Sequence, residues 1–251
     1  MDLGLRGKRA AVAAASAGLG LASARALAAE GVRVAVCGRD RERIEAAAAG
    51  LGPDAVGLVA DMGDADQAAG FVAEAADRLG GTVDIVVANA GGPPPGTFAS
   101  TDLDGYRRAI DLNLLSSIAL CRAAVPAMQA QGWGRVVAIT SIGVRQPPPH
   151  LMASATARAG LTAFLKVLAT EVAPDGVTVN SVQPGIHDTD RVRQLYGGAA
   201  PPPEAAAAIP VGRLGVPDDF GAVVAFLCSR QAGFVTGTGV LVDGGAFPGL
   251  V

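Results

Sequence analysis

An eight-residue stretch from Ala13 to Gly20 has the composition of an anion-binding turn. An apolar run, Arg9 to Ala13, leads into it and an alanine-rich segment, Leu21 to Glu30, follows, which predicts a strand, a glycine-bearing turn and a helix in that order. In that order, free N–H groups at the helix start point at an anion, with the helix dipole behind them. Gly18 and Gly20 suit the turn because a Cβ would block the strained bend or the close approach of the backbone. The stretch therefore predicts a phosphate-binding loop.

Short valine-rich runs alternate with amphipathic segments along the chain. After Arg9–Ala13, the runs expected to form buried strands are Val32–Cys37, Ala55–Val59, Val83–Ala88, Arg135–Thr140, Thr178–Val182 and Gly239–Val242. The segments expected to form helices are 21–30, 40–50, 64–79, 104–130, 154–173 and 217–228. This alternation predicts an α/β fold, a doubly wound parallel sheet with helices on both faces. No linker, repeat or charge block divides it, so we expect one domain over residues 1–251.

Composition narrows the function classes. Half of the 251 residues are apolar, 17% are charged, and the net charge is −3 with a pI near 5.4. Without a lysine-arginine stripe, nucleic acid and anionic membrane are poor candidates for partners. No His/Cys cluster has metal-ligand spacing, so no metal site is expected.

The cysteines and the N-terminus indicate a location. Cys37, Cys121 and Cys228 are odd in number, far apart and set in apolar runs, which predicts buried free thiols in a reducing compartment. Residues 1–6 lack the pattern of a signal peptide, and no apolar run is judged long enough to cross a bilayer. We therefore expect a cytoplasmic protein.

Several motifs share their order and spacing with one known family. The stretch 13–20 resembles the T-G-x-x-x-G-x-G loop of the short-chain dehydrogenase/reductases, with Ala13 in place of the Thr and Ala14 in place of the first Gly. Further matches follow at 89–91 (N-A-G), 158–161, 171–180, 184–189 (P-G-x-x-x-T) and 236–245. The resemblance runs from Leu5 to Phe247 and is nearest to the 3-oxoacyl-acyl-carrier-protein reductases. It implies a Rossmann-type sheet of seven parallel strands in the order 3-2-1-4-5-6-7.

The resemblance also implies a set of residues along a nicotinamide cofactor. Those of the loop and the strand ends are Ala14, Ser16, Gly18, Leu19, Gly20, Asp61, Met62, Asn89, Ala90, Gly91, Pro184, Gly185, Ile186 and Thr189. Asp61 would cap the adenine, with plain helix capping as the alternative. Thr189 would bond the carboxamide. Ala14 is expected to be tolerated in place of Gly if its φ is negative.

Arg39 bears on the choice between NADP(H) and NAD(H). An acidic residue after the second strand would bind the ribose 2′-OH and repel a 2′-phosphate, but Gly38 stands there and Arg39 supplies a fork-shaped cation. This favours NADP(H). The alternative is a solvated arginine at a helix start, where Asp40 is charged as well.

The catalytic positions depart from the family. Ser141 matches the serine that bonds the substrate carbonyl, and Asn113 matches a mid-helix Asn whose distortion holds a proton-relay water. The family's Tyr-x-x-x-Lys places a cation beside a phenol on one helix face and lowers the phenol pKa from about 10. Here Ser154 and Arg158 occupy those positions. Ser154 is a far weaker acid, and Arg158 stays charged, although it can still bind the nicotinamide ribose.

Three interpretations remain open. In the first, the protein oxidises or reduces a carbonyl or alcohol substrate, with Ser141 polarising it and protons coming from water, His150 or Tyr196. His187 is a further relay candidate. In the second, it binds nucleotide without turnover, and in the third it is an assembly subunit.

The region of about 187–210 is expected to form a substrate lid. Within it, Arg191 and Arg193 are candidates for contacting an anionic substrate, or else are solvated helix charges. The last strand and the apolar tail 247–251 predict a homotetramer or homodimer.

Overall fold

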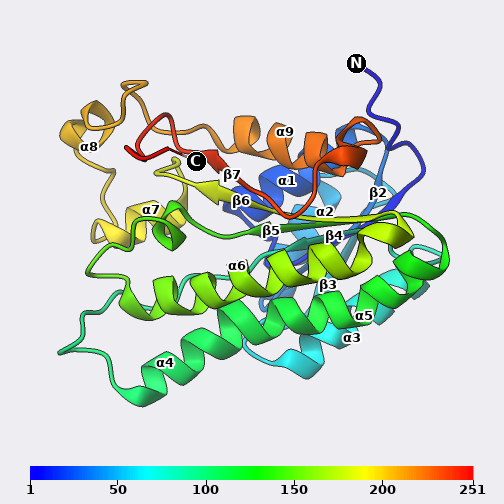
Figure 1. Ribbon diagram of the computed structural model, residues 1–251, viewed down its shortest axis with the longest axis horizontal. Helices are drawn as coiled ribbons and strands as arrows, with labels where there is room; N and C mark the ends of the chain where they lie inside the picture. The colour runs from blue at the N-terminus through cyan, green and yellow to red at the C-terminus, as the bar shows by residue number, and fades with distance from the viewer. Residues whose placement is uncertain (251) are drawn as a thin grey trace.

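A computed structural model describes residues 1–250, and its centre is a parallel sheet of seven strands (Figure 1). The strands are β1 (Arg9–Val12), β2 (Arg33–Gly38), β3 (Val56–Val59), β4 (Ile85–Ala88), β5 (Gly134–Ile139), β6 (Val177–Pro184) and β7 (Gly239–Val242). They pair in the order β3-β2-β1-β4-β5-β6-β7. The predicted order is confirmed, and the strand bounds differ from the predicted ones by at most two residues.

The helices lie on both faces of this sheet. The α-helices are α1 (Gly18–Ala29), α2 (Arg41–Ala49), α3 (Ala65–Arg78), α4 (Leu103–Ile110), α5 (Ser116–Ala130), α6 (Met152–Val172), α7 (Asp190–Leu195), α8 (Pro203–Ala207) and α9 (Pro217–Cys228). Short 3-10 turns are η2 (Ile142–Val144), η3 (Ala173–Asp175) and η4 (Gln231–Phe234). Val251, the last residue of the predicted apolar tail, lies outside the described residues.

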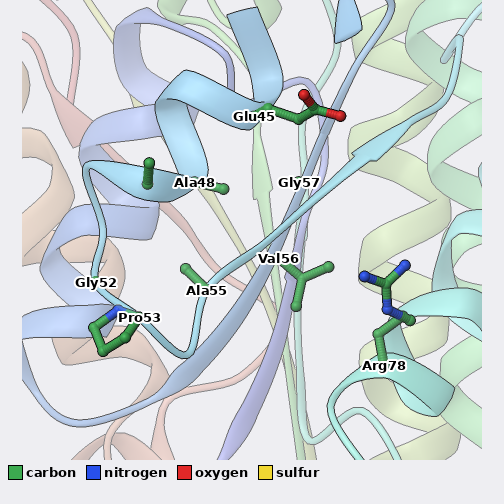
Figure 2. Close-up of a pocket in the computed structure, with 9 residues that line it drawn as sticks. Glu45, Ala48, Gly52, Pro53, Ala55, Val56, Gly57 and Arg78 are labelled. Carbon is green, nitrogen blue, oxygen red and sulfur yellow. The ribbon is translucent and has the colours of Figure 1, made fainter. Parts of the chain in front are cut away.

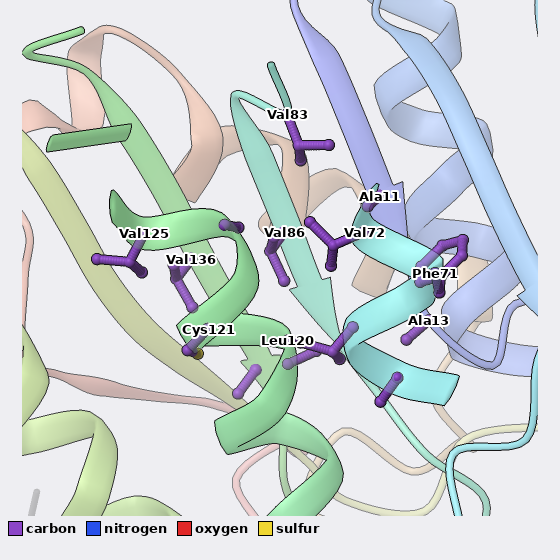
Figure 3. Close-up of a cluster of buried hydrophobic side chains, with 14 of the residues drawn as sticks. Ala11, Ala13, Phe71, Val72, Val83, Val86, Leu120, Cys121, Val125 and Val136 are labelled. Carbon is purple, nitrogen blue, oxygen red and sulfur yellow. The ribbon is translucent and has the colours of Figure 1, made fainter. Parts of the chain in front are cut away.

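Two cores form because successive strand residues point to opposite faces. In β1, Ala11 belongs to the core under α3, α5 and α6, whereas Val12 belongs to the core under α1, α2 and α9. Figure 3 shows the first core, where Phe71 of α3 and Leu120 of α5 cover strand residues such as Val86. The five inner strands are thus buried on both sides, as expected of continuous apolar runs, whereas the edge strands β3 and β7 are partly exposed.

One long helical segment joins α4 and α5 through a π-helical turn, η1 (Asp111–Leu115). This segment, Leu103–Ala130, is long and apolar enough to cross a membrane, judged by length and composition only. The prediction that no such run exists is therefore wrong. In the fold, α5 packs against α3, β4 and β5, which explains its apolar character without a membrane.

The three cysteines are buried and unpaired, as predicted. Cys37 lies in β2, Cys121 in α5 and Cys228 at the end of α9. Burial raises the pKa of each thiol to about 12. These side chains therefore behave as small apolar core residues.

Candidate active site

The predicted site residues gather at the carboxyl ends of β1, β4, β5 and β6. The first component is the start of α1. Its N-cap, Ala17, has an extended backbone and makes no side-chain capping bond, and the first turn holds no acidic residue. By contrast, α2, α3 and α4 are each capped by an aspartate, namely Asp40, Asp64 and Asp102. The start of α1 therefore keeps its N–H donors available to an anion.

Backbone conformation explains one loop glycine and corrects one expectation. Gly18 has a φ of +60°, which glycine adopts without strain. Ala14 has a φ of +47° and is the single non-glycine residue with positive φ among residues 1–250. The condition under which Ala14 was expected to be tolerated, a negative φ, is therefore not met. The bend uses a conformation that glycine adopts without strain, so Ala14 bears the strain.

Asn89 ties this loop to the middle of the sheet. Its Nδ2 donates to the carbonyl oxygens of Ala13 at 3.2 Å and Ala14 at 3.1 Å. A Cβ on Gly20 would lie 2.7 Å from that same nitrogen and 2.8 Å from the Ala14 oxygen. Gly20 is therefore required by close approach to the side chain that holds the loop in place.

Ser16 lies against Gly38, the last residue of β2, which directly precedes Arg39. A Cβ built on Gly38 would lie 3.5 Å from Ser16 Oγ, so the loop serine packs directly on the residue before Arg39. Arg39 is exposed. The arrangement offers a hydroxyl and a guanidinium at the place where an acidic residue would exclude a 2′-phosphate.

Asp61 and Met62 follow β3. The helix cap at α3 is Asp64, whose side chain accepts from Asp66 and Gln67, so the capping alternative for Asp61 is wrong. Asp61 instead closes a local turn, its Oδ1 accepting from Gly63 N at 2.8 Å. Met62 is 3% exposed and belongs to the core.

Ser141 follows β5 and caps η2. Its Oγ accepts from Gly143 N at 2.9 Å, which leaves the hydroxyl proton free to be donated. Asn113 lies in the π-helical turn η1 and is 1% exposed. Its Nδ2 donates to Gly91 O at 2.9 Å, while its Oδ1 is buried without a partner. A buried acceptor of this kind calls for a water or a ligand.

Ser154 and Arg158 lie one turn apart near the start of α6. Arg158 Nη1 donates to Ile139 O at 2.8 Å and to Thr140 O at 3.2 Å. The guanidinium thus binds the end of β5, directly before Ser141. Burial, and secondarily the charge of Arg191, lower the pKa of Arg158 to about 10, so it is still a cation at neutral pH.

The structure separates two arginines that the sequence treated alike. Arg193 is about half exposed and pairs with Asp188 at 2.7 Å and Asp190 at 3.2 Å. Arg191 points elsewhere: its Nη2 donates to Pro93 O at 2.7 Å, and its guanidinium lies against Gly92. Aspartates closely precede both arginines in the sequence, so the sequence contains no signal that their contacts differ. Only the fold brings Arg191 across to the loop after β4.

The segment after β6 meets the phosphate loop. Gly185 N donates to Val242 O, and a Cβ on Gly185 would lie 2.8 Å from Asp243 Cα. Pro184 ends β6, and Ile186 O accepts from Gly215 N at 2.9 Å. Thr189 caps α7 through its Oγ1, and its methyl lies near Gly18. Ala90, 9% exposed, and the partly buried Leu19 complete the predicted set.

The remaining proton-transfer candidates differ in their surroundings. His187 is 3% exposed, packs edge-on against Phe220, and its Nδ1 contacts Gly185 O. Burial lowers its pKa, which favours the neutral imidazole, and the ring packs against α9. His150 is exposed, and its carbonyl accepts from Gly96 N. Tyr196, at the end of α7, is 39% exposed.

Two hollows mark the surface. One of about 580 Å³ lies between α2, β3 and α3 (Figure 2), where small side chains such as Ala48 and Val56 line it with Glu45 and Arg78. It opens at the amino end of β3, away from the strand ends that carry the candidate residues. The other, about 210 Å³, lies between the start of α1 and α7 and includes Gly18 and Thr189. The smaller hollow is the one that belongs to the site. No metal-binding cluster of His, Cys, Asp or Glu is found within residues 1–250.

Comparison with known proteins gives one consistent family. The sequence profile described as enoyl-(acyl carrier protein) reductase matches residues 13–246. Dehydrogenase/reductase SDR family member 4 of Homo sapiens is 33% identical over 216 residues, which cover 84% of this chain and 77% of that protein.

Solved structures agree over the whole chain. L-sorbose reductase from Gluconobacter frateurii, determined with NADPH and L-sorbose, superposes with a TM-score of 0.92 at 29% identity and covers 100% of both chains. YwfH, described as an NADPH-dependent reductase involved in bacilysin biosynthesis, gives a TM-score of 0.91 at 25% identity, covering 97% of this chain and 99% of that one.

Proposed function

Because this chain belongs to the short-chain dehydrogenase/reductase family, we propose that it is an NADP(H)-dependent oxidoreductase with a non-standard proton donor. The family places it among oxidoreductases that act on carbonyl and alcohol groups. The choice of cofactor and the identity of the proton donor depend on the residues of this chain. In this proposal, residues 1–251 form one dinucleotide-binding domain with a lid at about 187–210.

The uncapped start of α1 is the observation that carries the proposal. Its free N–H donors and the left-handed Gly18 face the open side of the loop, while Gly20 lets Asn89 approach and hold the loop in place. The diphosphate of a dinucleotide fits this helix start by charge. Asp61 would then face the adenine, and Thr189 and Ile186 the carboxamide. When bound, the cofactor supplies or accepts a hydride.

Arg39 and Ser16 support NADP(H) over NAD(H). Arg39 has a freely exposed guanidinium, and the hydroxyl of Ser16 lies at the same strand end. A 2′-phosphate would gain charge-assisted hydrogen bonds from both groups. The NADPH-bound L-sorbose reductase provides independent support for the cofactor class.

The chain's own residues can polarise a carbonyl without a tyrosine. Ser141 keeps its hydroxyl proton free because its oxygen already accepts from Gly143 N. Arg158, held on the β5 carbonyls, places a permanent cation beside Ser141. Charge that develops on a substrate oxygen is stabilised by both groups. We assign the proton itself to a water that donates to the unpaired Oδ1 of Asn113, since that buried acceptor has no other partner.

A nucleotide-binding protein without turnover is the second candidate, and the absence of a phenol at position 154 is what favours it. An aliphatic hydroxyl and a fixed cation transfer protons less readily than a tyrosine-lysine pair. The two candidates predict the same cofactor binding and differ in turnover. A subunit that serves only for assembly would bind no cofactor.

The first experiment titrates the protein with NADPH and NADH by fluorescence. We expect tighter binding of NADPH, and we expect Arg39→Ala to weaken NADPH about tenfold or more while leaving NADH unchanged. Arg43→Ala, also exposed near the start of α2, is the matched control. Equal loss for both cofactors, or no binding of either, would contradict the NADP(H) proposal.

The second experiment measures cofactor oxidation with quinones, ketoacyl thioesters and diketones. We expect Ser141→Ala to reduce kcat about a hundredfold, as for loss of one oxyanion donor, without changing NADPH affinity. His150→Ala, on the exposed side, should retain activity. Binding without turnover across the whole panel would favour the second candidate.

Assembly and location complete the proposal. Large apolar side chains remain exposed on α6 (Val167, 67%) and η4 (Phe234, 102%), which supports a homotetramer or homodimer. The buried, unpaired thiols are consistent with the cytoplasm. Size-exclusion chromatography with light scattering tests the oligomeric state, and cell fractionation tests the cytoplasmic location.

A further inference from the structure

Two partly buried arginines are anchored at neighbouring strand ends of the candidate site. Arg158 of α6 donates to the carbonyls of Ile139 and Thr140 at the end of β5, and Arg191 of α7 donates to that of Pro93 in the loop after β4. Burial, and then the charge of Arg191, lower the pKa of Arg158. Burial lowers the pKa of Arg191 as well. Two like charges that are partly withdrawn from water and have no counter-charge cost free energy.

The other cations of the chain show how unusual this is. Exposed arginines such as Arg25, Arg41 and Arg193 pair with carboxylates at 2.7 to 3.3 Å. Within residues 1–250, neither Arg158 nor Arg191 has an ion pair. Arg135 is buried too, but it donates to three carbonyl oxygens and stacks on Trp133. The two site arginines share with Arg135 the lack of a counter-charge, but they lie at the candidate site and keep more of their N–H donors free.

Each guanidinium is held in place with donors to spare. Arg158 uses Nη1 for the carbonyls of Ile139 and Thr140, and Arg191 uses Nη2 for that of Pro93. The remaining N–H groups make no hydrogen bond within the described chain. A pre-positioned arginine with free donors matches a planar carboxylate in a bidentate manner.

The loop beside Arg191 favours a carboxylate over a phosphate. Sites for phosphate draw heavily on backbone N–H groups. Here Pro93, Pro94 and Pro95 follow Gly92, and proline has no N–H to offer. The guanidinium groups are thus the main donors. They suit one small anion with two oxygens.

We propose that the substrate carries a carboxylate close to its reacting carbonyl, as in a 2-oxo or 3-oxo acid, and that Arg191 together with Arg158 binds this carboxylate. The inference rests on the proposed function, since it names the substrate class of the same site. In the reduction, hydride adds to the carbonyl carbon, the C=O electron pair moves to oxygen, and water gives the proton. The alcohol and the oxidised cofactor are the products, and the carboxylate is unchanged.

The test compares carboxylates with their neutral isosteres. Oxamate and oxamide, then benzoate and benzamide, are titrated by calorimetry against the protein with and without NADPH. We expect the carboxylates to bind and the amides not to. Arg191→Gln should weaken the carboxylates about tenfold to a hundredfold, the loss of a charge-assisted hydrogen bond, with NADPH affinity unchanged. The carboxylate affinity of Arg191→Lys should lie between those of the native protein and Arg191→Gln, because lysine keeps the positive charge but lacks the planar guanidinium that binds two oxygens at once.

Arg193→Gln is the matched control, because this arginine lies on the same helix and is already paired with Asp188 and Asp190. Thermal melting of each variant verifies folding. Equal binding of amide and carboxylate would overturn the proposal, as would an unchanged affinity in Arg191→Gln or preference for inorganic phosphate. A loss of NADPH affinity in Arg191→Gln would assign this arginine to the cofactor diphosphate instead. Failure of the native protein to bind NADPH would contradict the proposed function, while carboxylate binding by the cofactor-free protein would remain measurable.

Discussion

Replacing Ala14 by glycine should stabilise the protein, although it removes a methyl group. Ala14 has a φ of +47°, a conformation that costs an L-residue with a Cβ roughly 1–2 kcal/mol. Glycine removes that cost. It also makes the unfolded chain more flexible, which destabilises the folded state by about 0.4–1 kcal/mol. The expected gain in the free energy of unfolding is therefore about 0.5–1 kcal/mol. For a chain of this size it corresponds to a rise in Tm of about 1–4 °C.

Urea unfolding followed by circular dichroism measures this gain as a higher midpoint with an unchanged slope. Ala46→Gly provides the control, because Ala46 is exposed in the middle of α2 and has ordinary helical geometry. There the same substitution should cost about 1 kcal/mol. If Ala14→Gly destabilises the protein as much as Ala46→Gly does, the left-handed bend does not carry the strain assigned to it.

Three further outcomes follow from the described contacts. Asn89→Ala should lower the free energy of unfolding by about 1–3 kcal/mol because two carbonyls lose their donor; an unchanged urea midpoint would contradict this. Burial lowers the pKa of His187 below 6.5 against the opposing charge of Asp219, so the unfolded chain binds the proton more readily and stability should fall as pH drops through 6.5. The fall between pH 7.5 and 5.5 should shrink in His187→Gln and persist in His150→Gln. Ellman's reagent at pH 8 should label no thiol in the folded protein and three after unfolding, and fast labelling of the native chain would contradict the burial of Cys37, Cys121 and Cys228.

The sheet was predictable because its signals are local and periodic. Valine-rich runs bounded by turns fix the strands, and α9 and β7 have the bounds that the sequence indicated. The strand order came from the family resemblance. The error over the helix Leu103–Ala130 arose because a core helix that packs against a sheet and other helices is as apolar as a membrane span.

The site was predictable where chemistry depends on strand ends and unpredictable where it depends on long-range packing. Asn89 follows β4, a strand that the sequence indicated, and the fold brings its side chain to the phosphate loop. The φ of Ala14 has no signal in residue type, since an alanine predicts negative φ. The separate destinations of Arg191 and Arg193 depend on how α7 lies against the loop after β4, which spacing along the chain does not encode.

The π-helical turn at Asp111–Leu115 has a mechanical consequence for the reaction centre. One additional residue in a helix rotates everything beyond it by about 100°. Through that rotation, α5 keeps its apolar side on the sheet while α4 turns Ala109 toward Ala153 and Ala157 of α6. These alanines flank Ser154 and precede Arg158. Deleting a single residue from the turn would therefore swing α4 off α6 and loosen Ser154 and Arg158, although every strand of the sheet would stay intact.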